Sequence, residues 1–463
     1  MMKNNNCITG KHIFLQHLYM RQENAEVKDE YYKRKKCFFE EAGLLSGKKI
    51  SFRDIDKEEI EKSIYDIRQV LFEVTEKCNL NCVYCTFGEL YGGNDERIKE
   101  KRNLKKEDAI KLLEYLYPVW KEREQKGLLQ KIMIGFYGGE PLLNFPIIED
   151  IVQWAKEHAT ERLTFGFMLT INGLLLDKHI DFLVKHDFMI AISLDGDEEN
   201  MSYRLDHNGK NCFKRVFSNI MAVKRDYPVC FDKNVNLLTV LHNKNSVEQA
   251  SRFCMIHFNK TPFCSNLTDS GIHPQKREQF SKMNEIIPTK PSKETIKALM
   301  KYEAGFSETI RFLQFFSGFH FYGYNDLLRK DERNEAKKFP AGACIPFSKK
   351  IYMTINGDLY PCERVDNCFS LGNIHANNVL DVEQITFRYN QYFKNISPTC
   401  TVCKRKFACK RCLFHIEGIQ GDKPQCSDIT DNVMFEHIVS SVIAVCKKHP
   451  DLYRKIMKQQ FSA

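Results

Sequence analysis

The chain has 463 residues, of which 43% are hydrophobic, and a formal net charge of +9. This length and composition exclude a disordered protein and allow one large domain with one or two smaller ones. The positive charge is dispersed along helix-like stretches without an aromatic-interleaved basic stripe, so we expect no nucleic-acid partner.

Apolar segments and cysteines limit the cellular location. No segment approaches the apolar length that crosses a membrane, and the polar start has no signal-peptide core behind it. We therefore predict a cytoplasmic protein without a membrane partner. In that reducing compartment the 18 cysteines are expected to be metal ligands and buried thiols rather than structural disulfides.

Residues 1–68 mix short apolar runs with charged stretches and end in a helical pattern from Lys57 to Ile67. No catalytic motif occurs there. We predict an N-terminal extension, which is either a substrate-docking module or a layer packed on the main domain.

Residues 69–270 alternate short β-branched or aromatic runs with longer amphipathic stretches, which indicates successive βα units. Six strands are expected at 71–75, 132–137, 163–170, 188–194, 235–241 and 262–267. Five helices are expected between them, at 105–122, 147–158, 177–186, 213–225 and 246–258. The pattern predicts an α/β fold, a partial (β/α)6 barrel of the TIM type, in which chemistry gathers at the carboxyl ends of the strands.

The first strand is followed by three cysteines, Cys78, Cys82 and Cys85. Thiolates hold iron–sulfur clusters, and a cubane cluster held by three of them leaves one iron free for another ligand. The same spacing also fits one face of a helix, where the cysteines would pack as small hydrophobic residues. The strand-like run before the motif favours a loop that leaves a strand.

Three further strand ends carry residues suited to a ligand. Gly138, Gly139 and Glu140 follow the second strand, and the glycines would let a ligand approach the backbone while the carboxylate holds a cationic amine. Asn172 follows the third strand, and the fourth carries Ser193. Each is ordinary turn chemistry alone, but all are expected at the same edge of the sheet.

Beyond the barrel we predict a helical bridge at 271–340, a cysteine-rich domain at 341–430 and a C-terminal helix at 431–463. The cysteine-rich domain contains eight cysteines within 83 residues, which suits two four-cysteine sites: Cys344, Cys362, Cys368, Cys400, Cys403, Cys409, Cys412 and Cys426. Such sites hold either structural zinc or iron–sulfur clusters.

Taken together, the Cys-x3-Cys-x2-Cys motif, Gly-Gly-Glu-Pro, Ser-Leu-Asp-Gly and the cysteine-rich tail resemble the radical SAM superfamily with its SPASM-type extension. The resemblance covers residues 70 to about 428 and is to maturases of ribosomally synthesised peptides; anaerobic sulfatase maturases share the architecture. It implies S-adenosyl-L-methionine (SAM) and three [4Fe–4S] clusters, one that binds SAM and two auxiliary ones.

The resemblance also implies individual roles. Cys78, Cys82 and Cys85 match the ligands of the SAM-binding cluster. The remaining matches concern SAM itself: Tyr84 near the adenine, Gly138, Gly139 and Glu140 at the amino group, Ser193 in contact with SAM, and Asn172 and Arg204 at the ribose or the carboxylate.

In the tail the family pattern assigns Cys344, Cys362 and Cys412 to the first auxiliary cluster. It assigns Cys400, Cys403, Cys409 and Cys426 to the second. Cys368 either completes the first cluster or leaves it with an open iron. The chain departs from the commoner pattern with two residues rather than three between Cys409 and Cys412.

Glu363 follows Cys362 at the position where sulfatase maturases carry an acidic residue thought to act as a base. It is a candidate catalytic residue; the alternative is a carboxylate on the surface or behind the site.

Three functional hypotheses remain open at this point. The first is a radical SAM maturase that cross-links a ribosomal precursor peptide, through a carbon–carbon or thioether bond, or epimerises one of its residues. Its partners would be that peptide, a flavodoxin- or ferredoxin-type electron donor and, because residues 1–68 show no clear leader-binding module, a separate leader-binding protein. The second is an anaerobic sulfatase maturase that forms formylglycine. The third is a non-catalytic, zinc-stabilised binding protein.

Overall fold

The computed structural model describes residues 51–91, 101–284, 337–403, 406, 409 and 411–429. Most of the predicted N-terminal extension, residues 285–336 of the predicted bridge and the predicted C-terminal helix lie outside these residues. The chain divides into two compact units. The sheet unit comprises residues 56–289 and 345–387, and the cysteine-rich unit comprises residues 1–55, 290–344 and 388–463.

The sheet unit is built on nine strands in the order β11-β10-β9-β2-β3-β4-β5-β6-β7. All six predicted strands are present, parallel and adjacent in chain order. Their bounds are β2 Gln69–Thr75, β3 Gln130–Gly138, β4 Leu163–Ile171, β5 Met189–Ser193, β6 Val235–Leu241 and β7 Phe263–Asn266. The predicted parallel α/β arrangement is therefore confirmed, and every one of these strands ends at the same edge.

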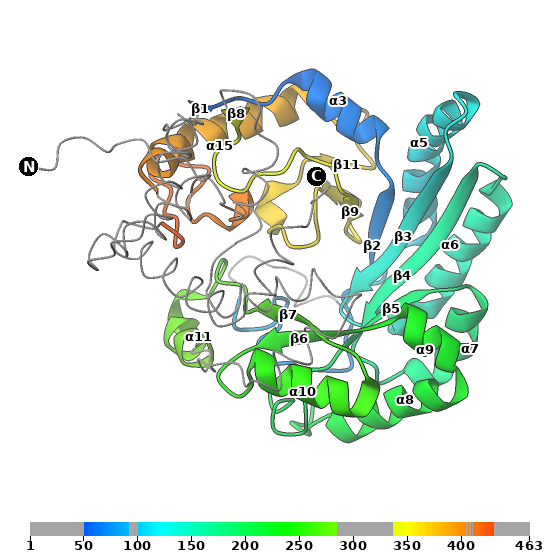
Figure 1. Cartoon of the computed structure of the whole chain (residues 1–463). Coiled ribbons are helices and arrows are strands. Elements are labelled where there is room, and N and C mark those ends of the chain that lie inside the picture. The colour runs from blue at the N-terminus through cyan, green and yellow to red at the C-terminus, as the bar shows by residue number, and fades with distance from the viewer. Residues whose placement is uncertain are drawn as a thin grey trace, which may run out of the picture. The chain divides into compact units, whose positions relative to one another are not determined.

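Helices connect the parallel strands and lie along one face of the sheet (Figure 1). They are α5 Lys106–Gln125, α6 Phe145–His158, α7 Leu176–Lys185, α8 Phe213–Asp226, α9 Pro228–Asn234 and α10 Val247–Phe258. Helix α7 illustrates why they pack there: Leu176, Ile180 and Leu183 recur at helical spacing, and all three are buried. Crossovers between sequential parallel strands are right-handed, which places successive helices on one side.

Three short strands extend the sheet beyond β2. Strand β9 (Ile351–Met353) pairs with β2 in parallel, and β10 (Asp358–Tyr360) and β11 (Gly372–Asn373) follow in antiparallel pairing. Strand β2 therefore lies between two neighbours, and its residues from Val70 to Thr75 are all buried. Part of the predicted cysteine-rich domain thus belongs to the same sheet as the barrel-type strands. Among the described residues, β7 and β11 remain the open edges.

Smaller elements complete the sheet unit. They are the helices α3 (Lys57–Tyr65) and α11 (Arg277–Met283) and the 3-10 turns η1 (Pro141–Asn144), η2 (Pro274–Lys276) and η3 (Asn367–Phe369). No helix among the described residues has the length and hydrophobicity needed to span a membrane.

The cysteine-rich unit contains a two-stranded parallel ladder between β1 (Ser51–Phe52) and β8 (Lys337–Lys338). Helix α15 (Val382–Val402) enters this unit from residue 388, and η4 (Leu413–His415) follows it. The Phe339 ring stacks on Phe393 at a centroid distance of 5.2 Å, and the Arg53 guanidinium lies 4.2 Å above Phe339.

Candidate active site

The three-cysteine segment is a loop that leaves the carboxyl end of β2, not a helix. A second loop, after β5, holds it through the backbone. Asn81 N donates to Leu205 O at 2.7 Å, and Val83 N donates to Tyr203 O at 2.9 Å. Cys78, Cys82 and Cys85 are therefore presented by irregular backbone at the strand-end edge of the sheet.

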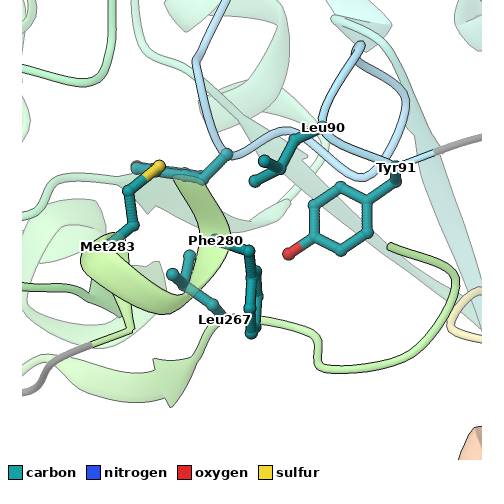
Figure 2. Packing of buried hydrophobic residues seen from close by; sticks show 6 residues of the cluster. Leu90, Tyr91, Leu267, Phe280 and Met283 are labelled. Atoms are coloured by element: carbon teal, nitrogen blue, oxygen red, sulfur yellow. The ribbon is translucent and has the colours of Figure 1, made fainter. Parts of the chain in front are cut away.

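The C-terminal end of the cysteine loop, beyond Cys85, is held by apolar packing (Figure 2). Leu90 and Tyr91, a few residues beyond Cys85, pack against Phe280 of α11 in a cluster of buried residues. The other members of this cluster are Tyr84, Leu267 and Met283. The Tyr91 hydroxyl also donates to Thr268 O at 2.8 Å. The loop is consequently held at both ends, which limits the positions of its thiols.

Gly138 and Gly139 fit against the start of the same loop. A Cβ atom on Gly138 would lie 2.3 Å from Thr75 O, and one on Gly139 would lie 2.2 Å from Lys77 O. Gly138 also has φ +126°, a conformation that residues with a side chain rarely adopt. Glycine is therefore required at both positions because the backbone of residues 75–77, just before Cys78, comes close to them. The approaching group in this structure is the chain's own backbone, not a ligand.

Glu140 is fully buried and joins two strand ends. Its carboxylate accepts hydrogen bonds from Leu142 N at 3.2 Å and from Asn172 N, just after β4, at 2.7 Å. Burial raises the pKa of Glu140 to about 7, although both backbone donors lower it. A cation beside the Glu140 carboxylate would therefore stabilise its ionised form.

Asn172 links Glu140 to the cysteine loop. Its side-chain amide donates to Asn79 Oδ1 at 2.7 Å and lies 3.9 Å from Cys78 Sγ. Glu140, Asn172 and Cys78 are therefore neighbours, as their shared position at strand ends predicts. Ser193 is the last residue of β5 and is half-buried.

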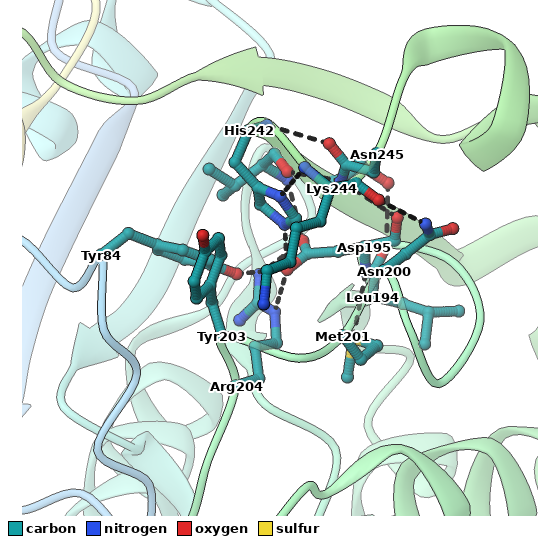
Figure 3. A network of polar contacts seen from close by, with 12 residues as sticks. Tyr84, Leu194, Asp195, Asn200, Met201, Tyr203, Arg204, His242, Lys244 and Asn245 are labelled. Carbon is teal, nitrogen blue, oxygen red and sulfur yellow. Dashed lines mark hydrogen bonds and ion pairs between the residues drawn. The ribbon is translucent and has the colours of Figure 1, made fainter. Parts of the chain in front are cut away.

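A polar network surrounds Asp195, two residues beyond β5 (Figure 3). Arg204 binds its carboxylate with two nitrogens, Nε to Oδ2 at 2.9 Å and Nη2 to Oδ1 at 3.0 Å. Tyr84 donates its hydroxyl to Oδ2, and Val240 N donates to Oδ1 at 2.9 Å. Burial raises the pKa of Asp195, but the charge and hydrogen bonds of Arg204 and the hydrogen bond from Tyr84 lower it to about 2, so the carboxylate is ionised.

This network brings together two predicted site residues, Tyr84 and Arg204, and two that the sequence analysis missed, Asp195 and His242. The Tyr84 ring packs on His242 at 5.8 Å, and the Arg204 guanidinium lies 5.3 Å from the Tyr84 ring. Asp195 belongs to the Ser-Leu-Asp-Gly motif, and His242 directly follows β6. Their position at strand ends was the signal that could have identified them.

The three thiols fit an iron–sulfur cluster chemically. None of them forms a disulfide bond, and Cys85 acts electrostatically on both Cys78 and Cys82. Burial raises the pKa of Cys78 to about 12 and raises that of Cys82 as well, so a positive centre is needed to hold them as thiolates. Leu80 N donates to Cys78 Sγ at 3.4 Å, a contact that favours a thiolate.

A site for one metal ion has a different geometry. Within the described ranges no three His, Cys, Asp or Glu side chains gather closely enough to hold a single ion. A cluster of several irons does not require its thiolates to meet at one atom.

Glu363 is a half-buried carboxylate of the sheet unit. It forms an ion pair with Lys350 at 3.0 Å and accepts a hydrogen bond from the Cys362 thiol at 3.2 Å. Burial raises the pKa of the neighbouring Tyr137, and the charges of Glu363 and Cys85 raise it further. The Glu363 side chain is 15% exposed, which excludes a fully solvated position.

In the cysteine-rich unit four of the tail cysteines lie near one another. Burial raises the pKa of Cys400 to about 12, and Cys409, Cys426 and Cys403 raise it further. Ala341 N donates to Cys400 Sγ at 3.3 Å. These four are the set that the family pattern assigns to the second auxiliary cluster.

The remaining tail cysteines are divided between the units. Cys344 and Cys412 belong to the cysteine-rich unit, where the two interact electrostatically. Cys362 and Cys368 belong to the sheet unit, where Cys362 is half-buried and Cys368 is exposed.

The fold and site define an α/β protein that presents three cysteine side chains from a loop at the carboxyl edge of a parallel sheet. Residues 72–254 match the Radical SAM superfamily, and this part of the chain belongs to that superfamily. The chain is 27% identical to the radical SAM cyclopropyl synthase TigE of Paramaledivibacter caminithermalis over 183 residues, 38% of this chain and 37% of TigE. It is 29% identical to a cysteine-type anaerobic sulfatase-maturating enzyme of Clostridium novyi over 175 residues, 37% of this chain and 42% of that enzyme.

Two further similarities cover more of the chain. The uncharacterized protein MJ0907 of Methanocaldococcus jannaschii is 24% identical over 322 residues, which are 69% of this chain and 93% of MJ0907. The solved structure of native anSMEcpe with bound AdoMet superimposes with a TM-score of 0.51 and 17% identity, over 84% of this chain and 100% of anSMEcpe. The chain thus contains a region that matches the Radical SAM superfamily, and over part of its length it is similar to a sulfatase-maturating enzyme.

Proposed function

We propose that the protein is a radical SAM enzyme that modifies a ribosomally synthesised precursor peptide, by a carbon–carbon or thioether cross-link or by epimerisation. The observation that carries the proposal is the gathering of Cys78, Cys82, Cys85, Glu140 and Asn172 at one edge of the parallel sheet. The similarity to TigE supports a maturase. Bound at these residues, a [4Fe–4S] cluster with SAM would supply the one-electron chemistry needed to remove a hydrogen atom from an unactivated carbon of the peptide.

The chain's own residues would bind and orient this cofactor. Cys78, Cys82 and Cys85 hold the cluster in the proposal, and the buried carboxylate of Glu140 attracts the SAM amino group. The other residues proposed to bind SAM are Tyr84, Gly138, Gly139, Asn172, Ser193 and Arg204. The apolar packing beside the loop would help to keep water away from the bound cofactor.

The proposal also includes two auxiliary clusters, an electron donor and a leader-binding protein. Cys400, Cys403, Cys409 and Cys426 would hold one auxiliary [4Fe–4S] cluster. Cys344, Cys362 and Cys412 would hold the other, either with Cys368 or with an open iron. A flavodoxin- or ferredoxin-type donor would reduce the clusters, and a separate protein would bind the peptide leader. The cytoplasm suits these thiols because it is reducing.

Sulfatase maturation is a second candidate, favoured by the position of Glu363. The carboxylate is half-buried, and the charges of Glu363 and Cys85 both raise the pKa of Tyr137. A base at that place could remove a proton from a substrate radical. The similarity to the Clostridium novyi enzyme is consistent with this alternative.

The experiment is anaerobic incubation of the reduced protein with SAM and a candidate peptide, followed by mass spectrometry. Its first readout is 5′-deoxyadenosine. The peptide is either a short product encoded beside this gene or a sulfatase segment with a central cysteine or serine. A cross-linked or epimerised precursor supports the first candidate, and formylglycine supports the second. Bound zinc without 5′-deoxyadenosine would overturn both in favour of a zinc-stabilised binding protein.

A further inference from the structure

The Asp195 carboxylate is fully occupied by hydrogen-bond donors. It is completely buried, and its two oxygens accept four hydrogen bonds from Arg204, Tyr84 and Val240. A carboxylate has about four acceptor sites, so none remains for a fifth donor. Two residues of the proposed SAM site, Tyr84 and Arg204, therefore depend on one carboxylate for their positions.

His242 faces this carboxylate without reaching it. Lys244 N donates to His242 Nδ1 at 3.1 Å, so Nδ1 is an acceptor and the ring proton of the neutral imidazole is on Nε2. Nε2 lies 3.9 Å from Asp195 Oδ2, beyond hydrogen-bond distance. Nε2 has no hydrogen-bond partner among the described residues, and the His242 side chain is completely buried.

A buried N–H group without a hydrogen-bond acceptor destabilises the folded state. Because Nε2 of His242 faces Asp195, that carboxylate is the acceptor it lacks. A shift of about 1 Å would bring Nε2 within hydrogen-bond distance of Asp195. Such a contact requires one present donor to give way. Arg204 can do so, because it binds Asp195 through two nitrogens and can give up one of these hydrogen bonds while it keeps the other.

We propose that His242 is a positioning residue for the SAM site: its Nε2–H group donates to Asp195 when SAM is bound. This inference rests on the proposed function. An anionic group of SAM draws the Arg204 guanidinium toward it, one acceptor site on Asp195 opens, and His242 fills that site. Asp195 then keeps its place, and the Tyr84 hydroxyl keeps its acceptor, so the loop between Cys82 and Cys85 does not shift.

The test compares three substitutions that separate the donor from the ring. His242→Gln keeps an N–H donor near the position of Nε2 but removes the ring. His242→Asn keeps an acceptor for Lys244 N but lacks that donor, and His242→Phe keeps the ring stacked on Tyr84 but has neither nitrogen. The measurement is the dissociation constant of SAM, from the SAM-dependent change in the electron paramagnetic resonance spectrum of the reduced, cluster-loaded protein.

We expect His242→Asn and His242→Phe to raise the dissociation constant of SAM about tenfold or more, because each loses a hydrogen bond to a charged group. His242→Gln should stay within about threefold of the wild type. A merely structural ring would give the reverse order, with His242→Phe the least affected. The matched control is His179 of α7, which stacks on Phe145 at 4.0 Å outside the network, and His179→Asn should leave SAM binding unchanged.

Iron content and thermal unfolding of each variant establish that it is folded and loaded. Equal SAM binding in His242→Asn, His242→Phe and the wild type would overturn the role of His242 alone. Equal weakening in His242→Gln and His242→Asn would also overturn it. A wild-type protein that carries clusters but gives no SAM-dependent spectral change would overturn the proposed function and this inference with it.

Discussion

Glu140 is the residue whose protonation is expected to control SAM binding. Burial raises its pKa to about 7, so it loses its charge as the pH falls through the neutral range. Only the ionised carboxylate attracts an amino group. The ionised fraction falls about tenfold between pH 8 and pH 6, and the dissociation constant of SAM should rise by about the same factor.

The control for this prediction is Glu140→Gln, measured by the same equilibrium binding titration. The variant should bind SAM more weakly at pH 8 and should show no corresponding pH dependence, because its amide does not titrate. An identical pH dependence in the wild type and the variant would show that another group is responsible.

For individual residues, the sequence predicts which residue types form the candidate site better than it predicts which of them contact one another. The cysteines, Glu140 and Asn172 were predicted from their positions at strand ends, and the structure places them together. Asp195 and His242 were not predicted. The buried ion pair between Asp195 and Arg204 depends on how the loop after β5 folds back on itself, and no periodicity in the sequence encodes that.

Among the elements, the turn after β3 determines where the cysteine loop begins. Gly139 packs directly on the backbone of Lys77, where a Cβ atom would lie 2.2 Å from the carbonyl oxygen. Neither backbone segment can move freely, since Glu140 N also donates to Lys77 O at 2.8 Å.

We predict that Gly139→Ala lowers the free energy of unfolding by about 1–3 kcal/mol, the usual cost of overpacking. It should also reduce iron at the SAM-binding site, because Lys77 precedes Cys78. Thermal unfolding and iron analysis measure both effects. Gly127→Ala is the control: its Cβ would have no neighbour closer than 3.9 Å, so only its φ of +81° opposes the change. Full iron loading in Gly139→Ala would contradict the prediction.

The six parallel strands were predicted to within a few residues because each was recognised as a short β-branched or aromatic run between turn signals. Strand β9 was not assigned to this sheet. This strand has only three residues, Ile351–Met353, which follow a pair of lysines, and so short a run does not indicate which strand it pairs with. Its position in the sheet is known only from its pairing with β2 in the structure.

On the scale of the whole molecule, the SAM-binding cluster and the second auxiliary cluster are proposed to belong to different units. Cys78 lies in the sheet unit, and Cys400 lies in the cysteine-rich unit. Loss of one cluster should therefore leave the other assembled.

We predict that Cys400→Ala lowers the iron content by about four atoms per chain while reduced protein still cleaves SAM. Peptide modification should fail in the same variant, since the auxiliary clusters serve the later steps of the proposed reaction. Complete loss of SAM cleavage in Cys400→Ala would contradict separate assembly of the two sites.

The most direct test of the central claim is SAM cleavage by the Cys82→Ala variant. Anaerobically reconstituted wild-type protein should bind about twelve irons, four for each of three clusters, and form 5′-deoxyadenosine when reduced. Cys254→Ala, which removes a buried thiol outside all proposed sites, should do the same. Cys82→Ala should lose about four irons and all SAM cleavage. Cleavage at the wild-type rate by Cys82→Ala would contradict the assignment of the three-cysteine loop as the place where the radical is made.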